Sequence, residues 1–395
     1  MLAACAGLDR VGIAVSGGGD SVAALVLATE ALGAARVRAV TVDHGLRPEA
    51  GAEAAAVARL CATLGVAHDL LCWDEGPRGG NLMGAARDAR LRLIGTWARD
   101  RVDAVVLAHT LDDQAETVLM RLARGSGVDG LAGMAERRVA GGILWLRPLL
   151  GVTRAELRAE LRRRGIGWVE DPTNADPRYQ RVRARRALAA LADLGVQASG
   201  LAATAQRMRR ARRALDAQAQ AAMDTLVRED RGTVSILAWP EPPEIRDRLA
   251  AHLLMQVSGA WHRPRLEDLH RLLDRGQGTL MGCALTPEGT GWRLSREARA
   301  VAGATGLPWD GRWWAEGPGP GEIRALGDAG LTRLSQQAKA GLHAHWRETG
   351  LTRSVLAGLP AIWHNGDLIA APLAAWPQGW RLRARPLAAI ADERA

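Results

Sequence analysis

A glycine-rich segment near the N-terminus has the composition of a phosphate-binding loop. It follows an apolar run over residues 11–15 and precedes a helical pattern that begins at Val22. Consecutive glycines let backbone N–H groups turn toward an anion, and the positive end of the following helix adds to the attraction. A kinase-like P-loop has Lys and then Ser or Thr where this chain has Asp20 and Ser21. The alternative is a tight turn in which Ser or Asp caps a helix. We expect a phosphate site of another type, formed by Ser16, Gly17, Gly18, Gly19, Asp20 and Ser21.

A second group of reactive side chains follows the apolar run over residues 104–108. If His109 ends a strand and a helix runs on from Asp112, then Asp113 and Glu116 share one face of that helix, because residues three apart are neighbours. Two carboxylates on one face can bind an ammonium group or coordinate Mg²⁺. An amine must also be held and deprotonated before it acts as a nucleophile. The alternative is an ordinary surface helix with a capping aspartate.

Both groups fall where a parallel sheet would bring them together. Short β-branched runs alternate with longer helical patterns through the first half of the chain, which predicts βαβ units. The expected strands cover residues 12–15, 37–42, 66–72 and 104–108, and the expected helices cover 21–32, 52–64, 83–99 and 114–124. Ligands of such sheets bind beyond the carboxyl ends of the strands. The glycine segment, Asp43 with His44, and His109 would therefore meet at one edge.

The glycine segment resembles the SGGxDS signature of the PP-loop, or N-type, ATP pyrophosphatases, which cleave ATP between its α and β phosphates. Further motifs narrow the resemblance to the tRNA(Ile)-lysidine synthetase family, and it extends over about residues 10–190. These motifs are residues 41–47, 109–117, 124–127, 130–134, 147–150 and 168–174. The resemblance implies an α/β fold, with a Rossmann-like parallel-sheet PP-loop ATPase domain followed by a helical linker and smaller α+β C-terminal domains.

The same resemblance implies an activity and its substrates. The family adenylates O2 of the wobble cytidine in an isoleucine tRNA with a CAU anticodon, and pyrophosphate leaves. The amine of L-lysine then attacks C2 and expels AMP, which changes the pairing preference of the base from G to A. The implied cofactors are ATP and Mg²⁺. The chain would then be a tRNA-modifying ligase that forms a carbon–nitrogen bond.

The resemblance also assigns roles to single residues. The glycine loop and Mg²⁺ would hold the pyrophosphate end of ATP, with Asp20 and Asp112 as metal ligands and Asp20 also in the catalytic set. Asp113 and Glu116 would receive the lysine ammonium. His109 would lie beside the reaction centre.

Arg90 matches a family arginine at the reacting groups. A cation there would stabilise the charge that develops on the α-phosphate. Arg87 lies one helical turn away, and the sequence does not separate the two. For either arginine the alternative is an ion-pair partner on an exposed helix.

Residues 168–186 resemble the element that joins the catalytic domain to the tRNA in this family. The segment includes Trp168, Asp171, Asn174, Tyr179, Arg181, Arg183, Arg185 and Arg186. The family pattern has Arg-Asn where this chain has Arg181 and Val182, so no single contact is assigned here. Tyr179 or Trp168 can stack on an unpaired base, and core packing is the alternative for Trp168.

The charge balance favours a polyanionic partner. The 395 residues carry a formal net charge of +9, and the pI is about 10.7. Nearly all the cations are arginines, whose planar fork suits bidentate phosphate contacts. The arginine-rich residues 207–213 lie in a long helix expected over 202–226. They either face RNA or form a solvated helix face.

The four cysteines, Cys5, Cys61, Cys72 and Cys283, lack the paired spacing of zinc sites and disulfide frameworks. We expect free thiols in a reducing cytoplasm. No apolar run approaches the roughly 18 residues of a membrane span, so no membrane partner is expected. The oligomeric state stays open, a homodimer being one option. The chain contains no Phe, so Trp must fill aromatic core positions.

We expect four segments along the chain. They are a PP-loop catalytic domain over residues 1–200, a helical linker over 201–229, a tRNA-binding accessory domain over 230–305 and a C-terminal tRNA-binding domain over 306–395. One helical stretch is expected over 246–273. The glycines and prolines of residues 317–321 predict a break in regular structure.

Two other kinds of function stay open. One is another PP-loop adenylating enzyme, either a tRNA thiolase or an ammonia-using amide ligase. The missing cysteine pairs disfavour thiolation, and the basic C-terminal half disfavours a small-molecule ligase. The other is a non-catalytic RNA-binding protein, which would need neither the intact glycine loop nor the 109–117 motif.

Overall fold

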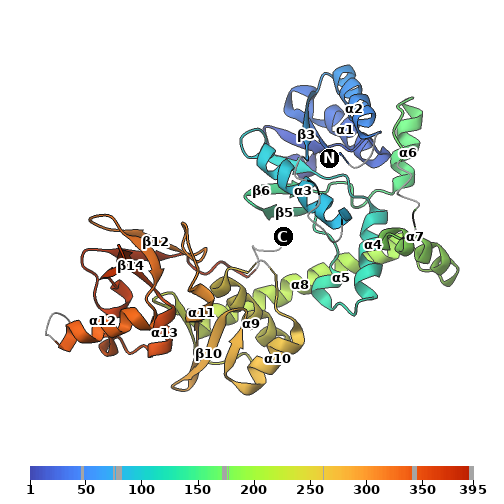
Figure 1. The fold of residues 1–395 in the computed structure, drawn as a ribbon. Coiled ribbons are helices and arrows are strands. Elements are labelled where there is room, and N and C mark those ends of the chain that lie inside the picture. Colours follow the sequence, from blue (N-terminus) through green and yellow to red (C-terminus); the bar gives the residue numbers. More distant parts are fainter. Residues whose placement is uncertain are drawn as a thin grey trace. The chain divides into compact units, whose positions relative to one another are not determined.

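The computed structural model describes residues 1–45, 49–73, 76, 82–170, 176, 178–260, 262–339 and 345–390. The chain forms two compact units, which divide between Arg213 and Ala214. Figure 1 follows them along the chain, with the first unit in blue to green and the second in green to red.

A six-stranded, mostly parallel sheet forms the centre of the first unit. Its strand order is β3-β2-β1-β4-β6-β5, and the neighbours are parallel except for β5, which runs antiparallel to β6. The strands are β1 (Val11–Ala14), β2 (Val37–Asp43), β3 (Ala67–Cys72), β4 (Ala104–Val106), β5 (Arg137–Ala140) and β6 (Ile143–Leu146). The expected strands are confirmed to within two residues, and the α/β class is confirmed with them.

The helices of this unit begin slightly before their expected positions. They are α1 (Gly19–Leu32), α2 (Ala50–Leu64), α3 (Leu82–Ala98), α4 (Leu111–Leu122), α5 (Val128–Leu131), α6 (Arg154–Arg163) and α7 (Gln180–Leu191). A long helix, α8 (Ala198–Leu226), follows them, and the division between the units falls inside it. The earlier starts arise because the helix caps are loop residues that carry no apolar periodicity.

Helices cover both faces of the sheet, as a parallel sheet requires. Val11 and Ile13 of β1 are buried against α1, α2 and α6. On the opposite face, Trp97 of α3 and Trp145 of β6 are buried in one core cluster. Their indole N–H groups donate to Asp69 Oδ2 at 2.9 Å and to the Ala140 carbonyl at 3.3 Å. Trp therefore fills aromatic core positions in this Phe-free chain. Because apolar side chains cover both faces of the sheet, polar chemistry is left to the ends of its strands.

The second unit is α+β. A five-stranded antiparallel sheet, ordered β7-β8-β11-β10-β9, packs against α9 and α10. Two smaller sheets, β12-β16 and β13-β14-β15, surround a separate core with α12 and α13. The strands are β7 (Val227–Asp230), β8 (Thr233–Ile236), β9 (Gly278–Leu280), β10 (Cys283–Glu288), β11 (Gly291–Arg296), β12 (Trp313–Glu316), β13 (Glu322–Ala325), β14 (Pro360–His364), β15 (Asp367–Ala370) and β16 (Arg381–Ala384). The helices are α9 (Pro243–Ser258), α10 (Leu266–Arg275), α11 (Ala298–Val301), α12 (Gly327–Lys339) and α13 (Arg353–Gly358).

One secondary-structure expectation is wrong. The helical stretch expected over residues 246–273 is two helices, α9 and α10. Gly259 ends α9 with a φ of +72°, a left-handed conformation that glycine adopts without a Cβ penalty. Pro264 then follows in the connection, where its ring cannot continue a helix. Residues 317–321 form no helix or strand, as expected, and connect β12 to β13.

Among the described residues, no single helix combines the length and the apolar composition that crossing a membrane requires. The segments 180–194 and 198–226 meet that test only when joined, and they bend by 101° where they meet.

Candidate active site

The glycine segment forms an open loop between β1 and α1. Gly17 has a φ of +83°, which explains a glycine at that position. Gly18 is the N-cap residue of α1 and makes no side-chain cap. A Cβ at Gly18 would meet only Ser16 Oγ, at 3.8 Å. The first N–H groups of a helix lack intrahelical acceptors, so this uncapped end is suited to an anion.

Ser21 fixes the loop rather than capping the helix. Its Oγ donates to the Gly18 carbonyl at 2.8 Å and accepts from the Ser16 N–H at 3.1 Å. The Val169 N–H donates to the Gly17 carbonyl at 3.0 Å and ties the loop to a distant segment. The alternative of a Ser- or Asp-capped turn therefore does not describe this loop.

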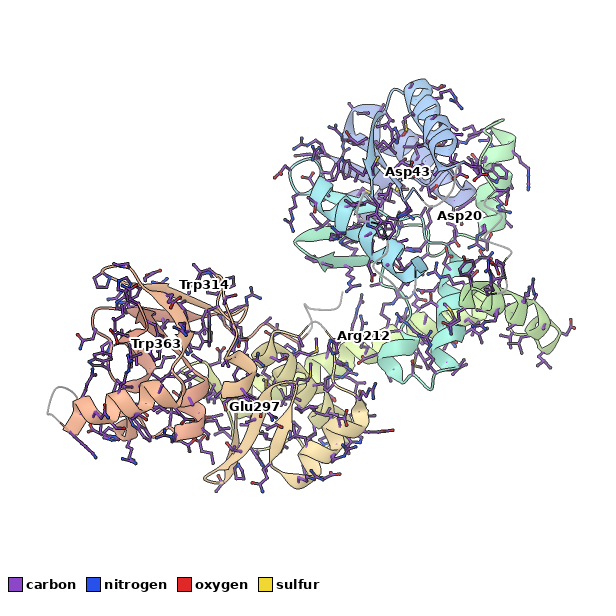
Figure 2. The ribbon with its side chains drawn as sticks, viewed as in Figure 1. Asp20, Asp43, Arg212, Glu297, Trp314 and Trp363 are labelled. Atoms are coloured by element: carbon purple, nitrogen blue, oxygen red, sulfur yellow. The ribbon has the colours of Figure 1, made fainter. Side chains whose placement is uncertain are left out.

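Asp20 offers one committed and one open oxygen. Its Oδ2 accepts from Arg154 Nε at 3.0 Å, whereas its Oδ1 is buried with no hydrogen-bond partner among the described residues. Burial raises the pKa of Asp20, and Arg154 partly offsets that effect. Asp20 and Asp43 both belong to the first unit (Figure 2). Asp20 lies in the helix that follows β1, and Asp43 is the last residue of the neighbouring strand β2.

The donor set fits a Mg²⁺ ion that a nucleotide brings with it. Asp112 Oδ2 accepts the Arg154 backbone N–H at 2.7 Å, so the same residue contacts Asp112 and Asp20. Within the part of the chain that the structure describes, no group of three or more His, Cys, Asp or Glu could hold a metal by itself. Mg²⁺ usually takes one or two carboxylates and completes its shell with phosphates and water, which the open oxygen of Asp20 suits.

Asp113 has both a structural role and a contact in the site. Asp113 Oδ2 accepts from the Thr110 N–H at 2.8 Å and from Thr110 Oγ1 at 2.9 Å, which completes a capping box at the start of α4. Its Oδ1 accepts from Arg154 Nη2 at 3.0 Å. Burial alone would raise the pKa of Asp113, but Arg154 and the Thr110 N–H outweigh it and lower that pKa. The predicted capping aspartate and the predicted site carboxylate are therefore the same residue.

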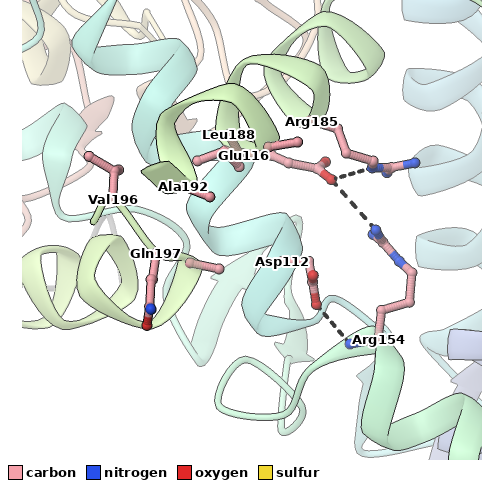
Figure 3. Close-up of a pocket in the computed structure, with 10 residues that line it drawn as sticks. Asp112, Glu116, Arg154, Arg185, Leu188, Ala192, Val196 and Gln197 are labelled. Carbon is pink, nitrogen blue, oxygen red and sulfur yellow. Dashed lines mark hydrogen bonds and ion pairs between the residues drawn. The ribbon is translucent and has the colours of Figure 1, made fainter. Parts of the chain in front are cut away.

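Glu116 lies one turn further along α4, and its side chain is only 1% exposed. Its Oε1 accepts from Arg185 Nε at 2.9 Å and lies 3.6 Å from Arg154 Nη1. Its Oε2 is buried without a hydrogen-bond partner among the described residues. Figure 3 shows Arg154 and Arg185 reaching Glu116 from two different helices, α6 and α7. A buried unpaired carboxylate oxygen is costly, and a bound cation would satisfy it.

A cavity of about 310 Å³ adjoins these carboxylates. Asp112, Glu116, Arg154 and Arg185 line its charged side (Figure 3). The opposite wall is mostly aliphatic and comes from the end of α7, the connection after it and the first residue of α8. It consists of Leu188, Ala189, Ala192, Val196 and Ala198, together with the polar Gln197. An apolar wall facing carboxylates and guanidiniums suits a small ligand with an aliphatic stem and charged ends.

His109 and three arginines lie beside Asp113. Burial lowers the pKa of His109, and Arg147, Arg181 and Arg87 lower it further, while Asp113 acts in the opposite direction. His109 Nδ1 has no hydrogen-bond partner among the described residues. The imidazole is therefore neutral near pH 7 and keeps a ring nitrogen available.

The structure shows that Arg87 and Arg90 interact with different groups, a distinction that the sequence did not make. Arg87 interacts electrostatically with Asp113 and His109. Arg90 instead influences His44 at the end of β2, whose pKa is lowered first by burial and then by Arg90. His44 itself packs edge-on against Trp73, with ring centroids 6.0 Å apart. The role proposed for Arg90 stays a prediction, and Arg87 is the arginine nearer the α4 carboxylates in this electrostatic sense.

The sequence did not indicate Arg154 as a site residue, and it did not predict which residue Arg185 contacts. Arg154 is the first residue of α6, directly after the N-cap Thr153, whose capping box with Glu156 is visible in the sequence. That signal places the helix start but does not say what the guanidinium contacts. Its partners Asp20 and Asp113 lie 134 and 41 positions away, beyond the reach of local periodicity.

Part of the expected tRNA element lies outside the described residues, namely residues 171–175 and 177, as do residues 46 and 47 of the motif over residues 41–47. Trp168 donates from Nε1 to Glu170 at 2.9 Å and stacks under Arg162 at 5.7 Å. Trp168 also packs against the core and approaches Gly19, where an added Cβ would lie 3.3 Å from its ring. Tyr179 is half-buried at the start of α7. Trp168 therefore packs against the core, which was the predicted alternative to stacking on an unpaired base.

The chain resembles known proteins over most of its length. Residues 2–192 match the family model of the PP-loop domain. The chain is 46% identical over 358 residues to the tRNA(Ile)-lysidine synthase of Ruegeria pomeroyi, covering 86% of this chain and 83% of that one. It is 42% identical to the corresponding synthase of Methylobacterium nodulans, over 74% of this chain and 91% of that one. It is 35% identical to the synthase of Rhizobium meliloti, over 87% of this chain and 81% of that one.

Proposed function

The chain belongs to the tRNA(Ile)-lysidine synthase family, and we propose that its first unit joins L-lysine to C2 of the wobble cytidine in a CAU-anticodon tRNA(Ile), with cleavage of ATP to AMP and pyrophosphate. One observation carries the residue-level proposal. The uncapped glycine loop with Asp20 and the α4 carboxylates share the guanidinium of Arg154. This arrangement supports a nucleotide site next to a cation site.

In the first step O2 of the cytidine attacks the α-phosphate, and pyrophosphate leaves. The loop from Ser16 to Ser21 would hold the departing phosphates through backbone N–H groups at the start of α1. Asp20 and Asp112 would hold Mg²⁺, which neutralises phosphate charge when bound. Arg90, on α3, would stabilise charge on the α-phosphate.

In the second step the ε-amine of lysine attacks C2 of the adenylated base, and AMP leaves. The ammonium would bind between Asp113 and Glu116, where Glu116 Oε2 has no hydrogen-bond partner among the described residues. The aliphatic stem of lysine would lie along the aliphatic wall of the cavity. Neutral His109 adds no positive charge beside the incoming ammonium. These contacts hold the amine so that it can lose its proton and attack.

Arginines around His109 would bind the tRNA near the reacting base. Burial lowers the pKa of Arg147 to about 10, with further contributions from Arg138 and Arg87. Arg147 Nε has no hydrogen-bond partner among the described residues. Cations that repel one another in the free protein gain when a phosphate enters between them, so we assign these arginines to phosphates of the anticodon loop.

The cysteines do not favour the thiolase alternative. Cys5, Cys61 and Cys283 are buried, and Cys72 is exposed at the end of β3. Burial raises the pKa of Cys61 and of Cys283 to about 11. A thiol with a raised pKa is a poor nucleophile at neutral pH.

The test of this function compares two transcripts of tRNA(Ile) that differ only at the wobble base. Pyrophosphate release from ATP is measured with C34 and with U34 transcripts, in the presence of Mg²⁺ and lysine. We expect release with C34 and only background release with U34. Equal release with both transcripts would contradict the proposed chemistry at the cytidine.

A further inference from the structure

Arg154 connects the nucleotide side of the site to its amine side. Nε donates to Asp20 Oδ2 and Nη2 donates to Asp113 Oδ1, each at 3.0 Å, while Nη1 lies 3.6 Å from Glu116 Oε1. The Arg154 side chain is 18% exposed, so these ion pairs lie largely out of water. Asp20 directly follows the glycine loop, whereas Asp113 and Glu116 belong to α4. One planar cation therefore serves both groups of carboxylates.

The capping of α6 does not explain why the Arg154 guanidinium lies among these carboxylates. Thr153 and Glu156 already cap the helix, and the Arg154 backbone N–H is satisfied by Asp112. A positive side chain at a helix N-terminus opposes the macrodipole. The position of the guanidinium is therefore set by the three carboxylates that it contacts.

The acceptor groups leave little room for a second cation while Arg154 is in place. Asp113 Oδ2 already accepts two hydrogen bonds from Thr110, and Asp113 Oδ1 is held by Arg154. Glu116 Oε1 is shared by Arg185 and Arg154, which leaves Oε2. An ammonium needs about three acceptors. To gain them between Asp113 and Glu116, it must take oxygens that Arg154 now holds.

We propose that Arg154 is a positioning residue that the ammonium of the amino-acid substrate displaces from Asp113 and Glu116, and that this displacement couples amino-acid binding to ATP binding. The inference rests on the proposed function, because it takes lysine as the occupant of the cavity. Displacement frees two guanidinium nitrogens next to Asp20 and the glycine loop. A freed guanidinium attracts phosphate, so lysine strengthens ATP binding, and ATP strengthens lysine binding by the same factor.

The test measures this coupling by calorimetry on the full chain. The dissociation constant of a non-cleavable α,β-methylene analogue of ATP, with Mg²⁺, is determined with and without saturating lysine. In the wild type we expect lysine to tighten binding by roughly 5- to 150-fold, the usual range of allosteric coupling. In Arg154→Met the factor falls to about one, because no cation is left for lysine to displace. In Arg154→Lys it also falls to about one, because a single ammonium cannot bind three carboxylates as the planar guanidinium does.

Arg163→Met is the matched control. Arg163 lies on the same helix, is exposed and pairs with Glu160 at 2.8 Å. The control keeps the wild-type coupling factor if the effect belongs to the site. A loss of coupling in Arg163→Met equal to that in Arg154→Met would overturn the proposal, since it would show a general effect of α6.

Two results separate this inference from the proposed function. If lysine binds the wild type but coupling is absent, or is unchanged in both Arg154 variants, the displacement is wrong and the function stands. If lysine does not bind the wild type with the analogue and tRNA present, the proposed function fails and the inference fails with it. Should the variants not fold, the ¹⁵Nη–¹Hη signals of Arg154 in the wild type decide, because Nη1 and Nη2 are the atoms that contact Glu116 and Asp113. These signals shift on lysine addition if the guanidinium is displaced, and unmoved signals overturn the proposal.

Discussion

Arg185 Nε lies 2.9 Å from Glu116 Oε1, although 69 positions separate the two residues. This contact joins α7 to α4 and leaves the other oxygen of Glu116 buried and unpaired among the described residues. A carboxylate that is almost fully buried and half-paired is poised to accept one more cation. Under the proposed function, Glu116 is therefore the residue on which we expect amine binding to depend most directly.

Glu116→Gln removes the charge and keeps the shape. We expect the KM for lysine to rise by roughly 10- to 150-fold, since a hydrogen bond to a charged group contributes about 1.5–3 kcal/mol. At saturating ATP, pyrophosphate release that depends on tRNA should change less than about twofold, because the amine takes no part in the chemistry of that step. Glu160→Gln, at a partly exposed carboxylate of α6 that pairs with Arg163 and Arg164, serves as control. Equal losses in both steps would contradict the assignment of Glu116.

Asp20→Asn is expected to act on the other step. Its open Oδ1 fits the metal that accompanies ATP, so pyrophosphate release should fall by roughly 10²- to 10³-fold, as when a transition-state stabiliser is removed. Binding of the tRNA, measured by filter retention, should stay near wild type because that affinity is spread over many arginines. Asp100→Asn, at an exposed position, should leave both quantities unchanged. Parallel loss of tRNA binding in Asp20→Asn would point to a folding defect instead.

Gly12 and Gly95 give opposite predictions for stability. A Cβ at Gly12 would lie 2.9 Å from Trp97 Cζ3, so Gly12→Ala should lower the free energy of unfolding by about 1–3 kcal/mol through overpacking. A Cβ at Gly95, inside α3, would meet Trp145 at an ordinary 3.7 Å. Gly95→Ala should therefore raise that free energy by about 0.5–1 kcal/mol. Urea unfolding followed by circular dichroism measures both, and a neutral Gly12→Ala would contradict the packing of β1 on α3.

His109 should stay neutral well below pH 6.5, because burial lowers its pKa. An unfolded chain takes up this proton near pH 6.5 and the folded chain does not, so acidification favours unfolding by about 1.4 kcal/mol per pH unit below that point. Between pH 7.5 and 5.5 the wild type should lose more stability than His109→Gln, by about 1 kcal/mol. Imidazole NMR signals, assigned with the same variant, follow the proton directly. Titration of His109 near pH 6.5 would show that the ring is solvated and contradict its placement.

Local patterns predicted the elements of the first unit, and contacts distant in sequence completed its site. The alternation of apolar runs located β1 to β4, and the spacing of Asp113 and Glu116 predicted their shared face on α4. Nothing in local spacing predicted that Arg154 would meet Asp20, since that contact depends on how α6 packs against α1. The division of residues 246–273 into α9 and α10 was missed because apolar periodicity outweighed Gly259 and Pro264 in the sequence interpretation.

The most direct test of the central claim is the product of the complete reaction. An unmodified C34 transcript of tRNA(Ile) is incubated with the protein, ATP, Mg²⁺ and labelled L-lysine, and the digested nucleosides are analysed by mass spectrometry. The account predicts one lysine joined to the wobble cytidine for each AMP and pyrophosphate formed, and no incorporation without ATP. Release of pyrophosphate without any lysine in the nucleoside would contradict it and would require a different nucleophile at C2.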